Sequence, residues 1–258
     1  MNSEIKYSIT TFSSKGTLAQ CERALTAATK GAPALGIRAS NGLVLASLKR
    51  TPSLLVDKNR IKKVFKVCDA IIGTFAGLSG DFRLVLETAR EIAVDYYKIY
   101  GRFPYVDAFI KEFSKVVQEK TQKGGLRPVG CICLFGGFAP IRKEIEADDE
   151  GRVVITELDR EKMQPLLYQI DPSGSIKCVF SAGVGKYYKE SSQFLANRCN
   201  AETEIYDAVS IAILALNENA ETALTEEDMD LCTITREGIK MYTAQEIKEV
   251  IDSSRTHH

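Results

Sequence analysis

Histidine is almost absent from this sequence of 258 residues, and tryptophan is absent altogether. The two histidines, His257 and His258, are the last two residues. Because the body of the chain has none, we do not expect a Ser-His-Asp or Cys-His mechanism, a histidine-ligated zinc site or a histidine general base.

An excess of charge of either sign is also missing, since 34 Lys and Arg balance 34 Asp and Glu. A general nucleic-acid or membrane-surface binder needs a basic excess, so we expect neither partner. The longest nearly apolar run, residues 70–78, is far too short to cross a bilayer, and the first residues have no apolar signal segment. The seven cysteines are scattered and contain no CxxC pair, which predicts reduced, buried thiols in a cytosolic or nuclear protein.

Helices and strands are predicted in blocks rather than in alternation. The apolar periodicity and the turn residues predict helices at 17–30, 82–100, 106–123, 187–198, 202–217 and 244–251, with Asp81 as a cap for the second. They predict strands at 32–40, 43–50, 61–67, 70–76, 129–138, 165–170, 175–182, 230–235 and 240–242. This order does not fit repeated βαβ units, and two antiparallel sheets between helical layers accommodate it in a single domain over 1–258.

An N-terminal motif, Thr10-Thr11-Phe12-Ser13, is followed by Gly16, Leu18, Gln20, Glu22 and Ala24. Later motifs are 124–130 (GGLRPVG), 171–174 (DPSG) and 183–185 (GVG). In this order, along nearly the whole chain, they resemble the α-type subunits of the proteasome core particle. The family's N-terminal signature is T-x-F-S-P-x-G-x-L-x-Q-x-E-Y-A, so Ser14 stands for the Pro and Arg23 for the Tyr. The resemblance implies an α+β fold, the four-layer αββα sandwich of the N-terminal-nucleophile hydrolases in its proteasome type.

The junction Gly31-Ala32-Pro33 lies between the first helix and the first strand. The catalytic branch of this fold is cut after a Gly at this junction and uses the exposed Thr as nucleophile and its own amine as base. Here Ala32 follows the Gly, so the resemblance implies no peptidase activity and no cofactor or metal. Two alternatives stay open at this stage: an active N-terminal threonine hydrolase of the same fold, and a stand-alone binding module.

For α-type subunits the resemblance implies ring assembly, pore gating and activator docking during ubiquitin-dependent degradation in cytoplasm and nucleus. The implied partners are neighbouring α-type subunits in a seven-membered ring, β-type subunits below it, and the C-terminal tails of a regulatory particle or activator. Lys63 falls where a docking lysine is expected, and Gly16, Glu22, Gly77 and Leu78 match other pocket positions. An exposed lysine that protects a basic strand edge is the alternative for Lys63.

The gate positions fit the family less closely. Tyr7 and Ser8 resemble its gate motif, but Phe12 follows about two residues too early, so the gating role of this short N-terminal segment, part of the 1–31 tail and helix, is left open.

Residues 139–164 form a charged stretch that is longer than the family's usual connection, and we expect an exposed insertion. Within it Glu146, Asp148, Glu150, Gly151 and Glu157 approach a calcium-loop template, but the flanks resemble strands and favour a solvated acidic turn. Similarly, Gly185-Lys186 lacks the rest of a phosphate loop. Cys131 and Cys133 should face one side of a strand, in the core.

Overall fold

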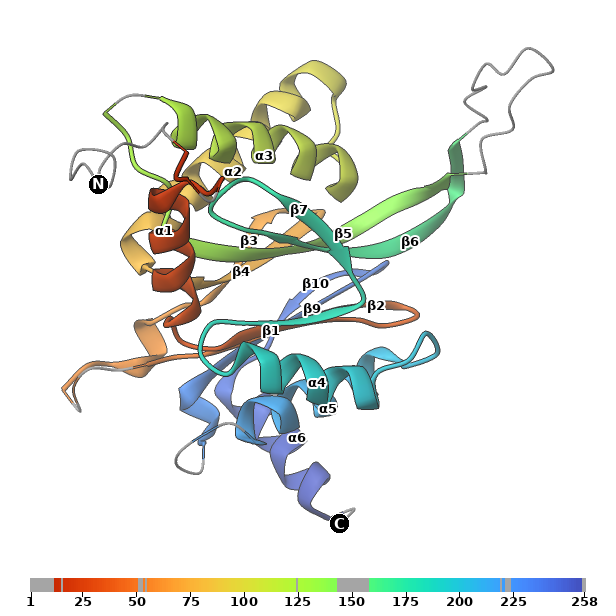
Figure 1. Ribbon diagram of the computed structural model, residues 1–258. Helices are drawn as coiled ribbons and strands as arrows, with labels where there is room; N and C mark the ends of the chain where they lie inside the picture. Colours follow the sequence, from red (N-terminus) through yellow and green to blue (C-terminus); the bar gives the residue numbers. More distant parts are fainter. Residues whose placement is uncertain are drawn as a thin grey trace.

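The computed structural model describes residues 12–14, 16–50, 53, 55–123, 125–142, 158–218, 220 and 224–256. Its ten strands form two five-stranded antiparallel sheets, ordered β10-β9-β2-β1-β8 and β3-β4-β5-β6-β7. Helices cover the outer face of each sheet, so four layers are stacked (Figure 1). The predicted αββα sandwich is confirmed.

The first sheet contains β1 (Ala34–Arg38), β2 (Gly42–Leu48), β8 (Ser181–Val184), β9 (Met229–Thr235) and β10 (Gly238–Met241). Both of its faces are buried at β2, where alternate residues belong to different cores. Leu43 and Leu45 pack between the sheets, while Val44 and Ala46 pack under the helices. Because both faces are covered, the strand is apolar throughout rather than alternating. The covering helices are α4 (Tyr188–Arg198), α5 (Ile205–Glu218) and α6 (Ala244–Thr256).

The second sheet contains β3 (Val64–Cys68), β4 (Ile71–Gly77), β5 (Cys131–Arg142), β6 (Leu158–Ile170) and β7 (Ile176–Val179). Two long helices, α2 (Ser79–Tyr100) and α3 (Val106–Gln122), cover it. Aromatic rings join these layers: Phe75 stacks on Phe82 at 3.9 Å between centroids, and Phe109 meets Phe135 edge-on at 5.4 Å. Burial of such rings supplies a large part of the apolar area of this core.

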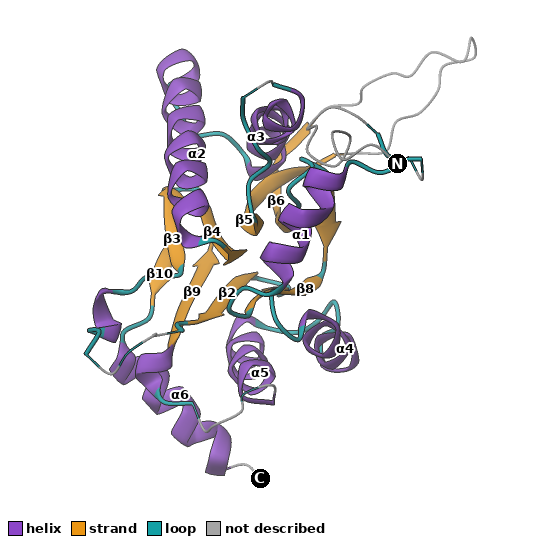
Figure 2. Ribbon diagram, turned by 60° about the vertical axis from the view of Figure 1, so that its left-hand side comes forward, coloured by secondary structure: helices purple, strands orange, loops and turns teal. Residues whose placement is uncertain are grey.

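Helix α1 (Ala19–Thr29) lies apart from these layers, against the ends of β4 and β5 (Figure 2). Two short 3-10 turns, Lys58–Arg60 and Glu226–Asp228, lie against each other at the entrances to β3 and β9.

The structure corrects three predictions. Asp81 does not cap α2, which begins at Ser79; its carboxylate instead accepts hydrogen bonds from Arg127 and from the Gly130 N–H. The strand predicted at 175–182 is two strands in different sheets, because the chain crosses over at Phe180. Residues 139–142 and 158–164, expected as the two ends of an exposed insertion, continue β5 and β6 as paired strands, with Ala139 buried and Ile141 37% exposed. The remainder of that stretch, including the calcium-like acids, lies outside the described residues.

Candidate functional site

The junction between α1 and β1 is enclosed by glycines. The Gly31 N–H donates to the Ala28 carbonyl, and the Gly31 carbonyl accepts the Lys186 N–H at 2.9 Å. A Cβ on Gly31 would lie 2.1 Å from the Gly77 nitrogen. A Cβ on Gly185 would lie 2.8 Å from the carbonyl oxygens of both Gly31 and Ala32. The backbone therefore passes through this point in close contact on two sides, and Ala32 offers no hydroxyl or thiol for catalysis.

Lys63 immediately precedes β3 and is buried, with 6% of its surface exposed. Its Nζ donates to the Phe75 carbonyl at 3.1 Å and lies 3.6 Å from the centroid of the Phe75 ring. The alternative of an exposed, edge-protecting lysine is therefore wrong. Burial lowers the pKa of Lys63 to about 8, because desolvation disfavours the ammonium form.

Asp230 fixes the backbone of Lys63. One carboxylate oxygen accepts the Lys63 N–H at 2.6 Å, and the other lies 3.1 Å from the Lys49 ammonium. Asp230 belongs to β9 and Lys63 to the approach of β3, so this buried carboxylate joins the two sheets. A second pair, Lys58 with Asp228 at 2.6 Å, joins the same two segments nearer the surface.

Gly77 and Leu78 lie beyond Phe75, at the end of β4. Gly77 has φ +125°, and an added Cβ would lie 2.2 Å from the Gly130 carbonyl and 3.1 Å from the Ala28 Cα, so only glycine fits between β5 and α1. The Leu78 N–H donates to that same Gly130 carbonyl, and its side chain is 47% exposed. Lys63 thus lies just before β3, and Gly77 and Leu78 lie at the end of β4, the strand that pairs with it.

Gly16 and Glu22 lie at the other end of α1. Gly16 (φ +75°) forms a turn in which its N–H donates to the Ser13 carbonyl. Exposed Glu22 lines a pocket of about 290 Å³ with Phe12, Leu18, Cys21 and the turn at 171–173. Glu22 and Ala28, which lies beside Gly77, are six positions apart on the helix, a rise of about 9 Å. The five predicted docking positions therefore form two groups in this chain. Gly16 and Glu22 lie toward the N-terminal end of α1, and Lys63, Gly77 and Leu78 lie toward its C-terminal end. Phe12 is exposed and bridges to Leu18, whereas Tyr7 and Ser8 lie outside the described residues.

Helix α2 leaves several large apolar side chains in solvent. Five of them are between 46% and 74% exposed: Leu84, Val94, Tyr97, Ile99 and Tyr100. They are distributed around the helix rather than along one stripe, and four of the five lie in its last two turns or just before them. The helical periodicity predicted the buried side of α2 but did not indicate these exposed apolar residues.

The structure also adds residues that the sequence analysis missed. Asp230 interrupts the apolar run of β9. An acidic residue in a buried strand needs a charged or hydrogen-bonding partner, so its position in the sequence could have indicated this site. Cys131 and Cys133 are confirmed as core residues, with their sulfurs 3.8 Å apart and both side chains buried. Within the described ranges there is no cluster of three potential metal ligands, and no helix combines the length and apolar character needed to cross a membrane.

The comparison with known proteins now gives the family. The proteasome subunit family model matches residues 28–145. Proteasome subunit alpha type-2 of Dictyostelium discoideum is 36% identical over 252 residues, covering 97% of this chain and 99% of the relative. The proteins of the same name from Oryza sativa subsp. indica and Trypanosoma brucei brucei are each 34% identical, covering 97% of this chain and 98% or 99% of theirs. This chain belongs to the proteasome subunit family.

Within the proteasome family the chain is of the α type. The segments 31–36 (GAPALG) and Asp95-Tyr96-Tyr97 resemble the second α-type paralogue, and the relatives carry that name. Because α-type subunits are the non-catalytic subunits, the chain is a structural subunit of the proteasome core particle and not an active threonine hydrolase. Ala32, which has no hydroxyl or thiol, is the physical counterpart of that conclusion at the Gly31-Ala32 junction. This identity also leaves a stand-alone binding module without support.

Proposed function

We propose that this chain is one of seven different α-type subunits in the outer ring, stacked on β-type subunits, where it helps to dock activator tails and to close the pore. The particle would act in ubiquitin-dependent degradation in cytoplasm and nucleus, which imaging of the tagged chain would test. The exposed apolar side chains of α2 support the assembly part, because burial of such side chains between subunits would remove them from water. Native mass measurement would refute assembly if the chain is a monomer under near-physiological conditions.

The observation that carries the docking part is the state of Lys63. Its ammonium is buried against one carbonyl and one aromatic face, with a pKa lowered by desolvation and no carboxylate in contact with Nζ among the described residues. A terminal carboxylate from an activator tail would supply the missing counter-charge. The two groups of predicted positions along α1 would then belong to pockets shared with neighbouring subunits.

The docking test uses assembled particles and a tail peptide that carries a photoreactive group near its free C-terminus. Lys63→Met should reduce cross-linking to this chain about tenfold or more, and amidation of the peptide terminus should have the same effect. Combining Lys63→Met with the amidated peptide should reduce cross-linking no further than either change alone, because both changes remove the same ion pair. Lys66→Met on the same strand is the matched control. Unchanged cross-linking with Lys63→Met would contradict the docking role.

The gating part concerns the segment before Phe12. Deletion of residues 2–9 should raise the basal hydrolysis of small fluorogenic peptides by whole particles, because a closed pore limits their entry. Equal rates with and without the segment would exclude a gating contribution from this subunit.

A further inference from the structure

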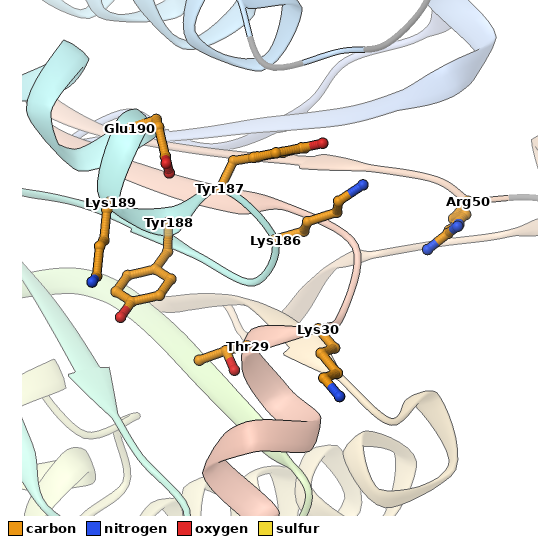
Figure 3. Close-up of a pocket in the computed structure, with 8 residues that line it drawn as sticks. All are labelled: Thr29, Lys30, Arg50, Lys186, Tyr187, Tyr188, Lys189 and Glu190. Atoms are coloured by element: carbon orange, nitrogen blue, oxygen red, sulfur yellow. The ribbon is translucent and has the colours of Figure 1, made fainter.

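A groove of about 480 Å³ opens beside the Gly31-Ala32 junction, where none of the predicted site residues lies. It is bounded by the end of α1, the second residue after β2 and the start of α4, and Figure 3 shows its lining. The lining residues are Thr29, Lys30, Arg50, Lys186, Tyr187, Tyr188, Lys189 and Glu190.

The charge of this groove is unbalanced, with four cationic side chains and a single carboxylate, Glu190. None of the ion pairs within the described residues involves Lys30, Arg50 or Lys189. All three side chains are exposed. An anionic ligand would therefore meet cations that are not already paired with a carboxylate, and attraction would guide it from a distance of about 10 Å at 0.1 M salt.

The start of α4 adds to this positive field. Tyr187 precedes the helix in the left-handed region, at φ 62°, and no side chain caps the first turn. Tyr187 therefore adds no side-chain acceptor at the N-terminal end of this eleven-residue helix, where the helix dipole is positive. The left-handed Tyr187 also places the turn so that both tyrosines line the groove.

The cations do not converge on one point. In Figure 3, Lys30, Lys186 and Arg50 lie on one side of the groove, and Lys189 with the Tyr188 ring lies on the other. A compact anion such as phosphate would need several donors around it, whereas cations spread along a groove with aromatic rings between them fit an extended acidic peptide.

The acidic stretch of this same chain is too short to be that ligand. Cys131, at the start of β5, lies beside Gly77 and the junction, and Arg142 is eleven residues further along the strand, about 37 Å away. Arg142 pairs with Leu158, so both ends of the fifteen residues between them start from the same point. Half of their extended length, about 27 Å, is the farthest they can extend from that point. The acidic stretch of this chain is therefore not the occupant of the groove.

We propose that this groove binds an extended, acidic peptide segment of another protein chain. A nucleic acid is the less suitable partner, because four cations and a net charge of zero give little of the basic surface that such binding requires. This inference goes beyond the docking role of Lys63 and does not depend on it.

The first test measures fluorescence anisotropy with the full-length chain and a labelled twelve-residue peptide of Glu, Asp and Ala. The triple variant Lys30→Glu, Arg50→Glu, Lys189→Glu should bind it about tenfold more weakly, because three attractions become repulsions. The matched control reverses three exposed lysines elsewhere, Lys111→Glu, Lys177→Glu, Lys248→Glu, with the same change in net charge. Circular dichroism checks that both triples remain folded.

Two further arms define the ligand. A peptide with Gln and Asn in place of the acids should not bind, and a single-stranded DNA of equal charge should compete no better than the unlabelled acidic peptide. Equal weakening by both triple variants, binding of the amide peptide, or stronger competition by DNA would each overturn the proposal.

In assembled particles, a photo-cross-linking residue at Tyr188 should attach to a segment of another chain rich in Asp and Glu, and the groove triple should reduce that product about fivefold. No protein cross-link, or attachment only to segments without acidic residues, would also overturn the proposal.

Discussion

Replacing Lys63 by Met should make the isolated chain more stable at neutral pH, even though the lysine makes a hydrogen bond. Burial lowers the pKa of Lys63 from 10.5 to about 8, and each unit corresponds to about 1.36 kcal/mol. The charged form therefore costs the folded state roughly 3 kcal/mol. A methionine fills similar space but leaves the Phe75 carbonyl without its donor, at a cost of about 1 kcal/mol. The net expectation is a gain of about 2 kcal/mol.

The pH dependence separates this explanation from a simple change in packing. The pKa of Lys63 is lower in the folded chain, so the unfolded chain binds more protons between pH 8 and pH 10.5. The penalty is complete below pH 8 and disappears as pH rises toward the unfolded pKa. The advantage of Lys63→Met in free energy of unfolding should therefore shrink between pH 7 and pH 10.

The assay is urea denaturation at pH 7, 8.5 and 10, followed by far-ultraviolet circular dichroism because the chain has no tryptophan. Lys66→Met, an exposed position on the same strand, should change the free energy of unfolding by less than about 0.5 kcal/mol at each pH. The reasoning fails if Lys63→Met is less stable than the original chain at pH 7, or if its advantage is the same at pH 10. A gain in stability that accompanies lost tail docking would indicate that Lys63 is retained for binding.

Three further substitutions test the core and the junction. Asp230→Ala should lower the free energy of unfolding by about 3–5 kcal/mol in urea, because it leaves the Lys49 ammonium buried without its carboxylate. Gly31→Ala should lower the melting temperature sharply, since its methyl group would overlap the Gly77 backbone, with an expected cost of at least about 3 kcal/mol. Ala32→Thr should leave fluorogenic peptide turnover at zero, because the uncut backbone provides no free amine.

Each of these three substitutions has either a control variant or a result that would contradict the expectation. Gly80→Ala, with nothing within 4 Å of the added Cβ, should stabilise α2 by up to about 1 kcal/mol and so separates the effect of Gly31 from loss of glycine as such. Asp230→Ala within 1 kcal/mol of the original would mean that solvent reaches the Lys49 ammonium. Measurable turnover by Ala32→Thr would show that the junction can be opened.

The blocks of helix and strand were predictable because their apolar periodicity reflects burial on defined faces. The α2 periodicity placed Phe82, Val85 and Ala89 on the buried side, where the structure has them. What the sequence could not show was how far pairing continues. Alternation is weak in 139–142 and 158–164, where charged residues and Pro140 occur, yet pairing with β6 extends β5 through a bulge to Arg142.

The surroundings of the predicted docking positions depend on contacts that are distant in sequence. Lys63 looks exposed in a run of basic residues, but Asp230, 167 positions later, binds its backbone and β4 supplies the carbonyl for its ammonium. Asp81 looks like a helix cap, but Arg127 lies close enough to form a bidentate pair that lowers the pKa of the carboxyl. Local pattern gives the identity of such residues, while only the fold gives their partners.

Absence of a nucleophile and presence of α1 are consequences of one arrangement at the junction. Cutting after Gly31 would turn a carbonyl that accepts the Lys186 N–H into a carboxylate pressed against Gly185. It would also remove the covalent link between α1 and β1, so that only the packing beside Gly77 and on β4 and β5 would hold the helix. A chain that needs α1 in place to carry Glu22 and Phe12 therefore cannot also present a free amine at residue 32. Catalysis and a fixed α1 exclude each other at this position, and this sequence retains the helix.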